Sequence, residues 1–278
     1  MPQPRPTPRI MGIVNVTPDS FSDGGRYLDH DLAIAHALRL CEEGADIIDV
    51  GGESTRPAGK DYGSGAERIT AREELARVLP VIAGISAARP DVAISIDTMK
   101  AAVAREALAA GARIINDVSA GRFDPVIMDV AAEHGATYVL MHGYDPLDAR
   151  DLDDIHYNNV VDEVFRFLAN RIRRAREYGV QSVVADVGIG FAKAAAQSEQ
   201  LLREHARFLD LGVPLLVGAS RKSFIGRALG GLPPEERLYG TLAAHAVAAA
   251  NGASIVRVHD VRPAREFFTV FNRLRSIP

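Results

Sequence analysis

The stretch "VAISIDTMKAAVAREALAAGARIIND", residues 92 to 117, holds two short apolar runs separated by a helical pattern. The runs at 92–97 and 112–117 are apolar without strict alternation, which is typical of parallel strands covered on both faces. The segment between them is amphipathic and closes on Gly111, a residue expected just past the end of a helix. The stretch therefore predicts a strand, a helix and a second, parallel strand.

The same unit recurs along the whole chain of 278 residues, of which 47% are hydrophobic. Eight apolar runs in strict alternation with helical patterns, at this length, predict an α/β fold, the (β/α)8 TIM barrel. An open doubly wound sheet is the alternative. We find no linker, so we predict one domain over residues 10–278 after a flexible, proline-rich segment, residues 1–9. The runs are residues 9–14, 45–50, 92–97, 112–117, 136–142, 181–186, 213–218 and 254–259.

Composition excludes several classes of protein. The formal charge of -4 gives no overall attraction to nucleic acid or to an acidic membrane. The single Cys41 cannot form a disulfide within the chain, and no run of about 18 apolar residues is long enough to span a membrane. We expect a cytoplasmic protein that binds small molecules.

Polar residues stand at or near the ends of the apolar runs. In a barrel, the carboxyl ends of the strands carry the chemistry, so these side chains are candidates for one shared site. Any one of them could instead cap the following helix. Together they would form a slot of carboxylates and amides suited to a flat, nitrogen-rich ring. They are Asp49, Asp97, Asn116, Asp117, His142, Asp186 and His259.

A second group is positively charged. Ser220, Arg221 and Lys222 follow the seventh run, while Arg257 and His259 lie two residues apart on the eighth and hence on one side of it. Barrels often bind phosphate at this place, so we expect a diphosphate there. The spacing of a Walker loop is absent from "GASRKS".

Two long loops follow the first and second runs. Residues 15–25 are rich in turn formers, and residues 51–70 contain five glycines around Thr55, Arg56 and Pro57. A loop arginine is a natural partner for phosphate charge that develops late in a reaction. A disordered surface loop is the alternative for residues 51–70.

Seven motifs, in order, resemble those of the bacterial dihydropteroate synthase family. They are "NVTPDSFSDGG", "DVGGESTRP", "SIDT", "INDVSAG", "DVGIGF", "GASRKSFIG" and "RVHDV". The resemblance implies a (β/α)8 barrel, usually a homodimer and a sulfonamide target. It also implies a transferase that joins 6-hydroxymethyl-7,8-dihydropterin diphosphate to p-aminobenzoate in folate synthesis, releasing diphosphate, with Mg2+ bound.

The resemblance further implies a role for each matching residue. Asn15 would hold Mg2+, and Arg56, Arg257 and His259 would contact the diphosphate with Thr55 at its edge. The p-aminobenzoate would be framed by Pro57, Phe191, Ser220 and the stem of Lys222. The pterin slot would be lined by Asp97, Asn116, Met141, Asp186 and Lys222. Catalysis would rest on Arg56, Asp186, Lys222, Arg257 and His259.

The chemistry favours an SN1-like path. An aromatic amine is a weak nucleophile, so its attack benefits from a pterin methylene that becomes cationic as diphosphate leaves. Cations stabilise the leaving group, and a carboxylate such as Asp186 stabilises the cation.

The chain departs from the family pattern at three places. Val187 and "AKA" (192–194) replace the usual Pro and "GKT", "MHGYDP" (141–146) is short, and the segment after Pro57 is longer. We expect altered loop geometry and retained activity. Two alternatives stay open: a corrinoid-dependent methyltransferase that uses methyltetrahydrofolate, and a pterin-binding paralogue without catalysis.

Overall fold

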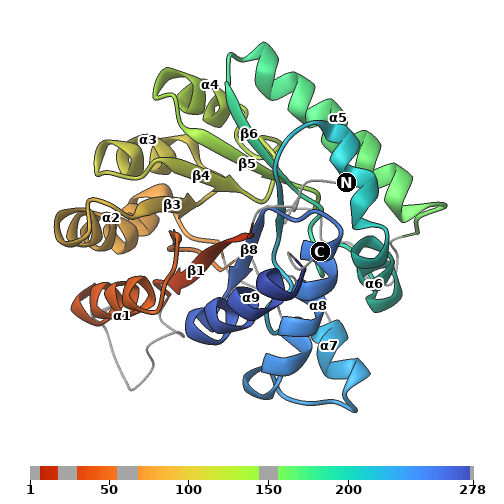
Figure 1. The fold of residues 1–278 in the computed structure, drawn as a ribbon. Coiled ribbons are helices and arrows are strands. Elements are labelled where there is room, and N and C mark those ends of the chain that lie inside the picture. Colours follow the sequence, from red (N-terminus) through yellow and green to blue (C-terminus); the bar gives the residue numbers. More distant parts are fainter. Residues whose placement is uncertain (1–6, 18–29, 55–67, 144–155, 276–278) are drawn as a thin grey trace.

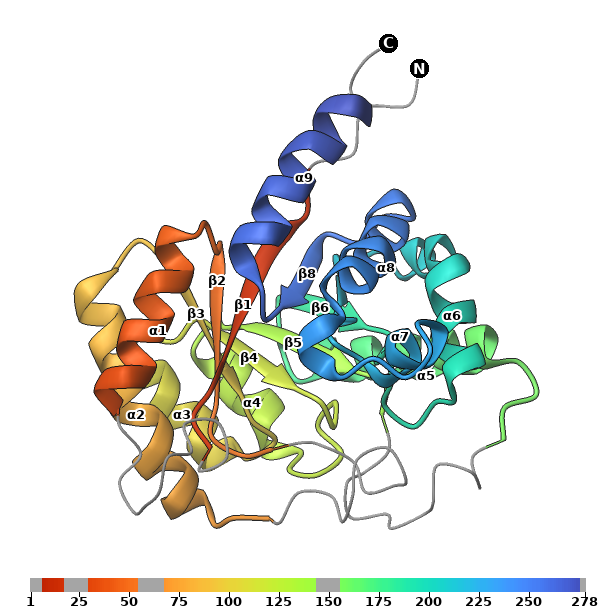
Figure 2. The same ribbon diagram turned by 90° about the horizontal axis from the view of Figure 1, so that it is seen from below.

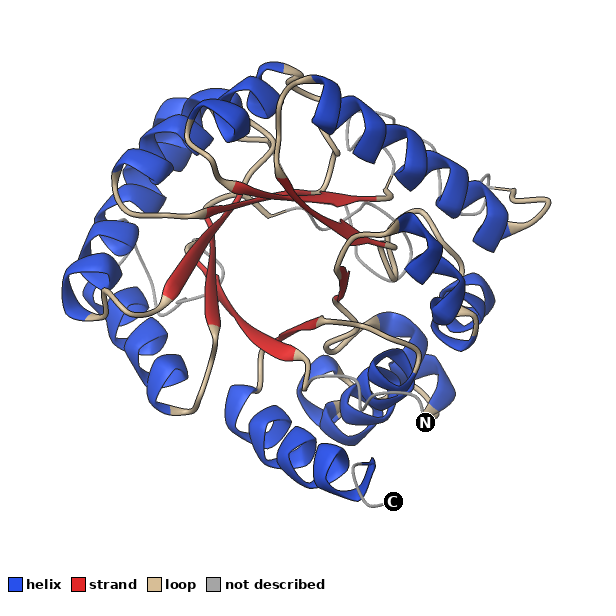
Figure 3. Cartoon of the chain, turned by 45° about the horizontal axis from the view of Figure 1, so that its top comes forward, coloured by secondary structure: helices blue, strands red, loops and turns tan. Residues whose placement is uncertain are grey.

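The computed structural model describes residues 7–17, 30–54, 68–143 and 156–275. Within these residues, eight parallel strands pair in sequence order, and β8 pairs back with β1 to close a barrel. The strands form an inner ring and the helices an outer one (Figures 1 and 3). The predicted (β/α)8 fold is confirmed and the open sheet is excluded. The strands are β1 (Arg9–Asn15), β2 (Ile47–Gly51), β3 (Ala93–Asp97), β4 (Ile114–Asp117), β5 (Thr137–Met141), β6 (Ser182–Asp186), β7 (Leu215–Val217) and β8 (Ile255–Val258).

The helices alternate with the strands, and two of them lie between β7 and β8. Helix α9 follows β8 and projects beyond the body of the barrel (Figure 2). The α-helices are α1 (His30–Glu42), α2 (Ala71–Ala88), α3 (Ala101–Ala109), α4 (Val126–Glu133), α5 (Val160–Glu177), α6 (Ala195–Arg203), α7 (Ser223–Ala228), α8 (Leu238–Ala250) and α9 (Val261–Arg275). Two 3-10 helices, η3 (His205–Leu211) and η4 (Pro234–Glu236), complete the described elements.

Each of the eight predicted runs corresponds to one strand, and β1 and β2 each end one residue beyond their run. Strand β1 begins at Arg9, whose amide donates to the carbonyl of Ser254 (2.9 Å). Most of the predicted flexible segment, residues 1–6, lies outside the described residues. The prediction of a single domain over residues 10–278 stays a prediction.

Alternation along the strands separates two cores. Outward side chains such as Ile48, Ile94 and Ile115 pack against the helices in one large cluster. Inward side chains fill the barrel with a second, smaller apolar cluster, so the barrel is a packed core and no pore. The inner cluster consists of Met11, Ile47, Ile114, Val139, Val184, Leu216 and Ile255.

The inward series turns polar towards the carboxyl ends of the strands. Side chains two apart on a strand share a face, so Ile47 is followed inside the barrel by Asp49, and Ile114 by Asn116. The apolar cluster is therefore the floor on which a polar site rests. In the described part of the chain we find no helix long and apolar enough to cross a membrane.

Candidate active site

Strand pairing brings the predicted polar residues to one level of the barrel. Gly51 pairs with Asp97, and Asp97 pairs with Asn116. The carboxyl ends of the strands surround the mouth of the barrel. On the other side of this mouth, Met141 pairs with Asp186. Residues paired across parallel strands point to the same face, so these side chains converge on the inside of the barrel.

Arg257 lies at the centre of this convergence. Its Nε donates to Oδ2 of Asp49 (2.6 Å), and its Nη2 donates to Oδ2 of Asp97 (2.8 Å). The Asn116 side-chain amide also donates to Oδ2 of Asp49 (3.1 Å). Asp49 is fully buried, and Asp97 and Asn116 are nearly so. Four side chains from β2, β3, β4 and β8 thus form one network above the apolar floor.

The network leaves hydrogen-bonding capacity unused. Oδ1 of Asp49, Oδ1 of Asp97 and Oγ of Ser95 are buried without a partner in the described residues. Burial raises the pKa of Asp97 to about 7, although the Arg257 guanidinium opposes the rise. Buried polar atoms normally find partners, so this polar network suits a ligand or waters that bring hydrogen-bonding groups to it.

Asp186 and Lys222 form the second half of the mouth. Oδ1 of Asp186 accepts the amide of Gly188 (2.7 Å), and burial raises the pKa of this carboxyl, opposed by the backbone bond and by Lys222. Burial lowers the pKa of Lys222 to about 8, and its Nζ lies 3.9 Å from the centroid of the Phe191 ring. Phe191 packs on an apolar wall that includes Met141.

The loops after β7 and β8 are joined to each other. Oγ of Ser220 accepts the amide of His259 (3.2 Å) and lies 2.9 Å from Nδ1 of that ring. Arg221 and Asp260 pair through two bonds, Nε to Oδ2 (3.1 Å) and Nη2 to Oδ1 (2.7 Å). Burial lowers the pKa of His259 to about 3, helped by Arg257 and Arg221, so the ring is neutral at pH 7.

Comparison of the chain with known proteins points to one family of enzymes. The model of the pterin binding enzyme family matches residues 11–259. A dihydropteroate synthase of Synechocystis sp. is 46% identical over 95% of this chain and 89% of its own length, and one of Bacillus subtilis is 45% identical over 91% and 84%. The chain belongs to the pterin-binding enzyme family. It is an enzyme, a transferase of the dihydropteroate synthase kind, as the sequence predicted.

Solved structures of this family have the same fold. The dihydropteroate synthase of Xanthomonas albilineans with 4-aminobenzoic acid superposes with a TM-score of 0.88 at 46% identity, covering 98% of this chain and 94% of that one. The same enzyme in complex with 7,8-dihydropteroate gives 0.85 at 44% identity, covering 98% and 95%. The match extends over the whole barrel and not over a part of it.

Asn15 fits the magnesium site that the family pattern implies. It ends β1 with an exposed side chain, in contrast to the buried residues before it, and its strand partner Gly51 lies beside Asp97. The described residues contain no cluster of three or more His, Cys, Asp or Glu side chains that could enclose a metal. Mg2+ commonly takes one or two protein oxygens and completes its shell with water and substrate phosphates, so it does not require such a cluster, and the assignment of Asn15 stays a prediction.

Two predicted strand-end residues do not enter the mouth. Asp117 faces the helices, where it accepts the Tyr138 hydroxyl (2.6 Å) and the amides of Ser119 (2.7 Å) and Gly121 (2.6 Å). His142 lies against Phe167 of α5, with ring centroids 4.8 Å apart. Both residues shape loops and do not face the substrate side.

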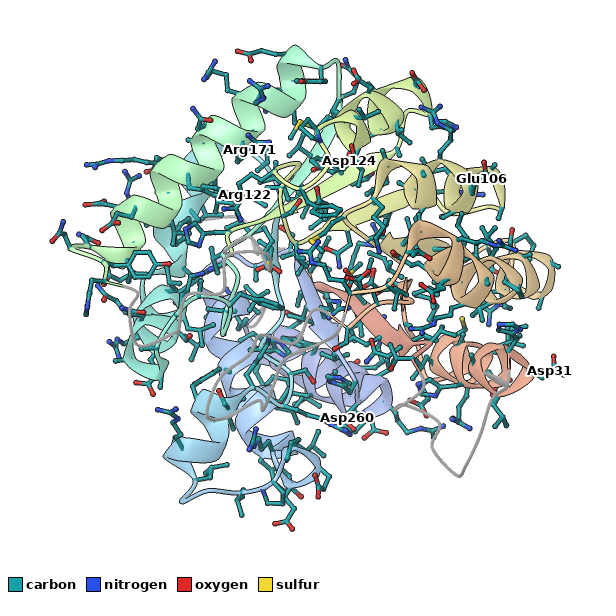
Figure 4. All side chains as sticks on the ribbon, turned by 180° about the vertical axis from the view of Figure 1, so that it is seen from behind. Asp31, Glu106, Arg122, Asp124, Arg171 and Asp260 are labelled. Atoms are coloured by element: carbon teal, nitrogen blue, oxygen red, sulfur yellow. The ribbon has the colours of Figure 1, made fainter. Side chains whose placement is uncertain are left out.

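Two arginines hold the loop after β4 in which Asp117 makes these bonds. Arg171 of α5 donates to the carbonyl of Ala120 (2.8 Å), and Arg122 donates to the carbonyl of Ser119 (2.9 Å). Figure 4 shows Arg171 on its helix close to the loop that carries Arg122. The outer side of this part of the mouth is thus fixed by backbone contacts.

The second long loop is described only at its start. Thr55, Arg56 and Pro57 lie outside the described residues, so their predicted roles stay predictions. Just before them, the ammonium of Lys100 bonds the carboxylates of Glu53 and Glu74. The loop therefore leaves the barrel from a buried, paired anchor.

The sequence did not assign a role to two residues of this site. Asp49 was recognised only as a strand-end acid, although its position two residues after Ile47 on a strand marks it as inward. Lys193 matches the lysine of the family's "GKT", but neither that match nor the uncharged turn around it indicates what the lysine does.

Proposed function

We propose that this chain condenses 6-hydroxymethyl-7,8-dihydropterin diphosphate with p-aminobenzoate to give 7,8-dihydropteroate and diphosphate in folate biosynthesis. One observation carries the proposal. Acids and amides from β2, β3, β4 and β6 lie together inside the barrel, above its apolar floor. Cations from the ends of β7 and β8 lie beside them. The acids and amides suit a pterin and the cations suit a diphosphate, and the related structure with 7,8-dihydropteroate supports the pterin assignment.

The pterin would lie against Asp97, Asn116 and Asp186. One oxygen of Asp186 accepts the Gly188 amide, which leaves the other able to accept from the ring. The unpartnered Oδ1 of Asp97 is a second acceptor. Donors of the ring left unpaired in such a buried slot would cost about 1–3 kcal/mol each.

The diphosphate would lie against Arg257 and His259, with Arg56 and Thr55 closing over it. If the Ser220 hydroxyl donates to Nδ1 of His259, the neutral ring carries its proton on Nε2, a donor for phosphate oxygens. Asn15 would hold Mg2+, which when bound supplies positive charge to the leaving diphosphate. Each group would stabilise charge that grows as the C–O bond breaks.

The reaction would follow an SN1-like path. The C–O bond to diphosphate breaks first, and the electron-rich dihydropterin and the carboxylate of Asp186 stabilise the methylene cation. The amine of p-aminobenzoate then forms the C–N bond and afterwards loses a proton. Catalysis on this path needs no covalent bond between enzyme and substrate.

The p-aminobenzoate would lie between Phe191 and the stem of Lys222, with Ser220 and Pro57 at its ends. The ammonium of Lys222 lies over the Phe191 ring in this structure and would move aside to admit the aromatic amine. Met141 packs behind Phe191 and would line the pterin side. We further propose that the chain is a homodimer and a sulfonamide target, as the resemblance implies, and that it is cytoplasmic, as expected from its composition.

The proposal is tested by measuring diphosphate release from the pterin substrate with Mg2+, with and without p-aminobenzoate. We expect fast release with both substrates and formation of 7,8-dihydropteroate in equal amount. Binding of the pterin without release would indicate a paralogue that lacks catalysis. Methyl transfer from methyltetrahydrofolate to a corrinoid would favour the methyltransferase alternative, against which the cation cluster argues.

A further inference from the structure

The turn after β6, residues 187–194, is an unusual piece of backbone. Gly188 (φ 69°), Gly190 (φ 73°) and Ala192 (φ 52°) all adopt left-handed conformations. A Cβ at Gly188 would lie 1.9 Å from the carbonyl oxygen of His142, so the turn approaches the end of β5 very closely. Such a turn holds its shape only when its surroundings fix it.

Lys193 supplies much of that fixation from inside the protein. Its Nζ donates to the carbonyls of His142 (3.0 Å), Gly188 (3.0 Å) and Phe191 (2.8 Å) and lies 2.9 Å from Nδ1 of His142. Only 5% of the residue is exposed. One ammonium thus connects the end of β5 to two points of the turn.

The ammonium has no carboxylate within ion-pair distance among the described residues, in contrast to Lys100. Burial lowers the pKa of Lys193 to about 7, opposed by the more distant Asp186. Burial and the Lys193 charge lower the pKa of His142 to about 2, so that ring is neutral. Burying a lysine without a carboxylate partner is unfavourable, and its contacts are three backbone carbonyls and one imidazole nitrogen, so we expect its role to lie in the backbone that it binds.

The contacts of Lys193 determine where Phe191 lies. The carbonyl of Phe191 is bonded by Lys193, and the next carbonyl, of Ala192, is bonded by the Tyr157 hydroxyl (2.8 Å). The Phe191 ring is in turn covered by the Lys222 ammonium. Without the Lys193 bonds, the carbonyl of Phe191 would lose this donor, the carbonyl of Gly188 would keep only the Phe191 amide, and the ring would lose an anchor.

We propose that Lys193 is a positioning residue that holds the turn after β6 against β5, so that Phe191 is in place for the aromatic amine. The inference rests on the proposed function, which assigns Phe191 to p-aminobenzoate. It assigns Lys193 no contact with either substrate. The residue acts only through the backbone of the turn.

The test compares wild type with Lys193→Met, which keeps the length and apolar stem and removes the donors. We expect the KM for p-aminobenzoate to rise at least 10-fold and kcat to fall. The Kd for the pterin diphosphate should change less than 3-fold, because Asp97, Asn116 and Arg257 are unaltered. Amide exchange in a peptide spanning residues 187–194 should accelerate.

Two further variants make the test decisive. Tyr157→Phe removes the hydroxyl that bonds Ala192 in the same turn and should raise the KM for p-aminobenzoate less, since all three Lys193 carbonyl bonds remain. If Lys193→Met does not fold, Lys193→Gln, which retains an amide donor, is judged by the same criteria. An unchanged KM for p-aminobenzoate, or equal losses for both substrates, would overturn the inference. A wild-type chain without diphosphate release would instead refute the proposed function, independently of Lys193.

Discussion

Arg257 is held by two carboxylates before any phosphate reaches it. Its bonds to Asp49 and Asp97 use two of the five N–H donors of a guanidinium, so donors remain for phosphate oxygens. Removing one partner of a buried pair typically costs about 3–5 kcal/mol, since the other charge is left without compensation. The two carboxylates therefore hold the Arg257 guanidinium in place at the mouth of the barrel.

Asp186→Asn tests the pterin slot at a single residue. The substitution keeps size but replaces a carboxylate, whose free oxygen can accept a charge-assisted bond from the ring, by a neutral amide, so we expect the Kd for the pterin to rise about 10-fold or more. Titration calorimetry measures the change. Asp210→Asn, at an exposed carboxylate outside the barrel, is the control and should leave the Kd unaltered. Unchanged affinity in Asp186→Asn would remove this residue from the slot.

Adjacent residues show where prediction from sequence ends. Asn116 and Asp117 both end the same apolar run, and a run without alternation does not reveal which of them faces inward. In the structure, Asn116 points into the barrel and donates to Asp49, whereas Asp117 points outward and accepts from the Tyr138 hydroxyl. Register with neighbouring strands decided this, and register is a property of the closed barrel.

At the scale of elements, the loops after β7 and β8 act as one unit. The Arg221–Asp260 pair is partly exposed, but its two-bond geometry ties the loops where Ser220 meets His259. We expect Asp260→Asn to raise the KM for the pterin diphosphate about 3- to 10-fold, because His259 loses its fixed position. Steady-state kinetics checks this, and Glu133→Gln, which breaks the exposed pair with Arg105, should change nothing. No effect of Asp260→Asn would mean that Ser220 alone positions His259.

The turn after β6 gives a prediction about stability. Ala192 stands where the family has Gly, and its φ of 52° is one that a Cβ disfavours by about 1–2 kcal/mol. We therefore expect Ala192→Gly to raise the free energy of unfolding, by up to about 1 kcal/mol after the greater entropy of an unfolded glycine is subtracted. Urea unfolding measures it. A lower stability would show that the Ala192 methyl group contributes packing that outweighs the strain.

The elements themselves were predictable from sequence because each strand is a short apolar run and each is followed by an amphipathic helix. The carbonyl contacts of Lys193 were not predictable. Two of the acceptors lie 51 and 5 residues away in the chain, and every residue type has a backbone carbonyl. The family pattern assigned the polar contacts without showing what holds the turn that bears Phe191.

For the whole molecule, buried histidines contribute to the loss of folding stability at acidic pH. Burial lowers the pKa of His205 and of His245 to about 4. Between pH 6.5 and 4 the unfolded chain binds protons that the folded chain does not, so each histidine contributes stability that is present above pH 6.5 and lost as the pH falls. Asp97 has the opposite sign, since its raised pKa removes stability as the pH rises towards 7.

His205→Leu isolates one of these groups far from the mouth. Both ring nitrogens of His205 lack partners among the described residues, so the substitution removes a titration without breaking a bond. The free energy of unfolding should fall less steeply between pH 6 and 4, by about 1.4 kcal/mol per pH unit. Urea unfolding across this range measures the slope. His156→Gln, at an exposed ring, should leave it as in wild type; an unchanged slope in His205→Leu would show that His205 becomes protonated without cost.

The barrel as a whole was predictable because the count of units and the length admit few architectures. The convergence of side chains spread over more than 200 positions, from Asp49 to Arg257, followed from the rule that parallel strands end at one face. What the sequence could not provide was the pairing among them, which depends on distances that only the closed barrel sets.

A crystal structure with the pterin diphosphate bound tests the central claim most directly. We predict the ring above the floor with hydrogen bonds to Asp97, Asn116 and Asp186, and the phosphates within reach of Arg257 and His259. A pterin bound elsewhere, with these side chains still paired only to one another, would contradict the account.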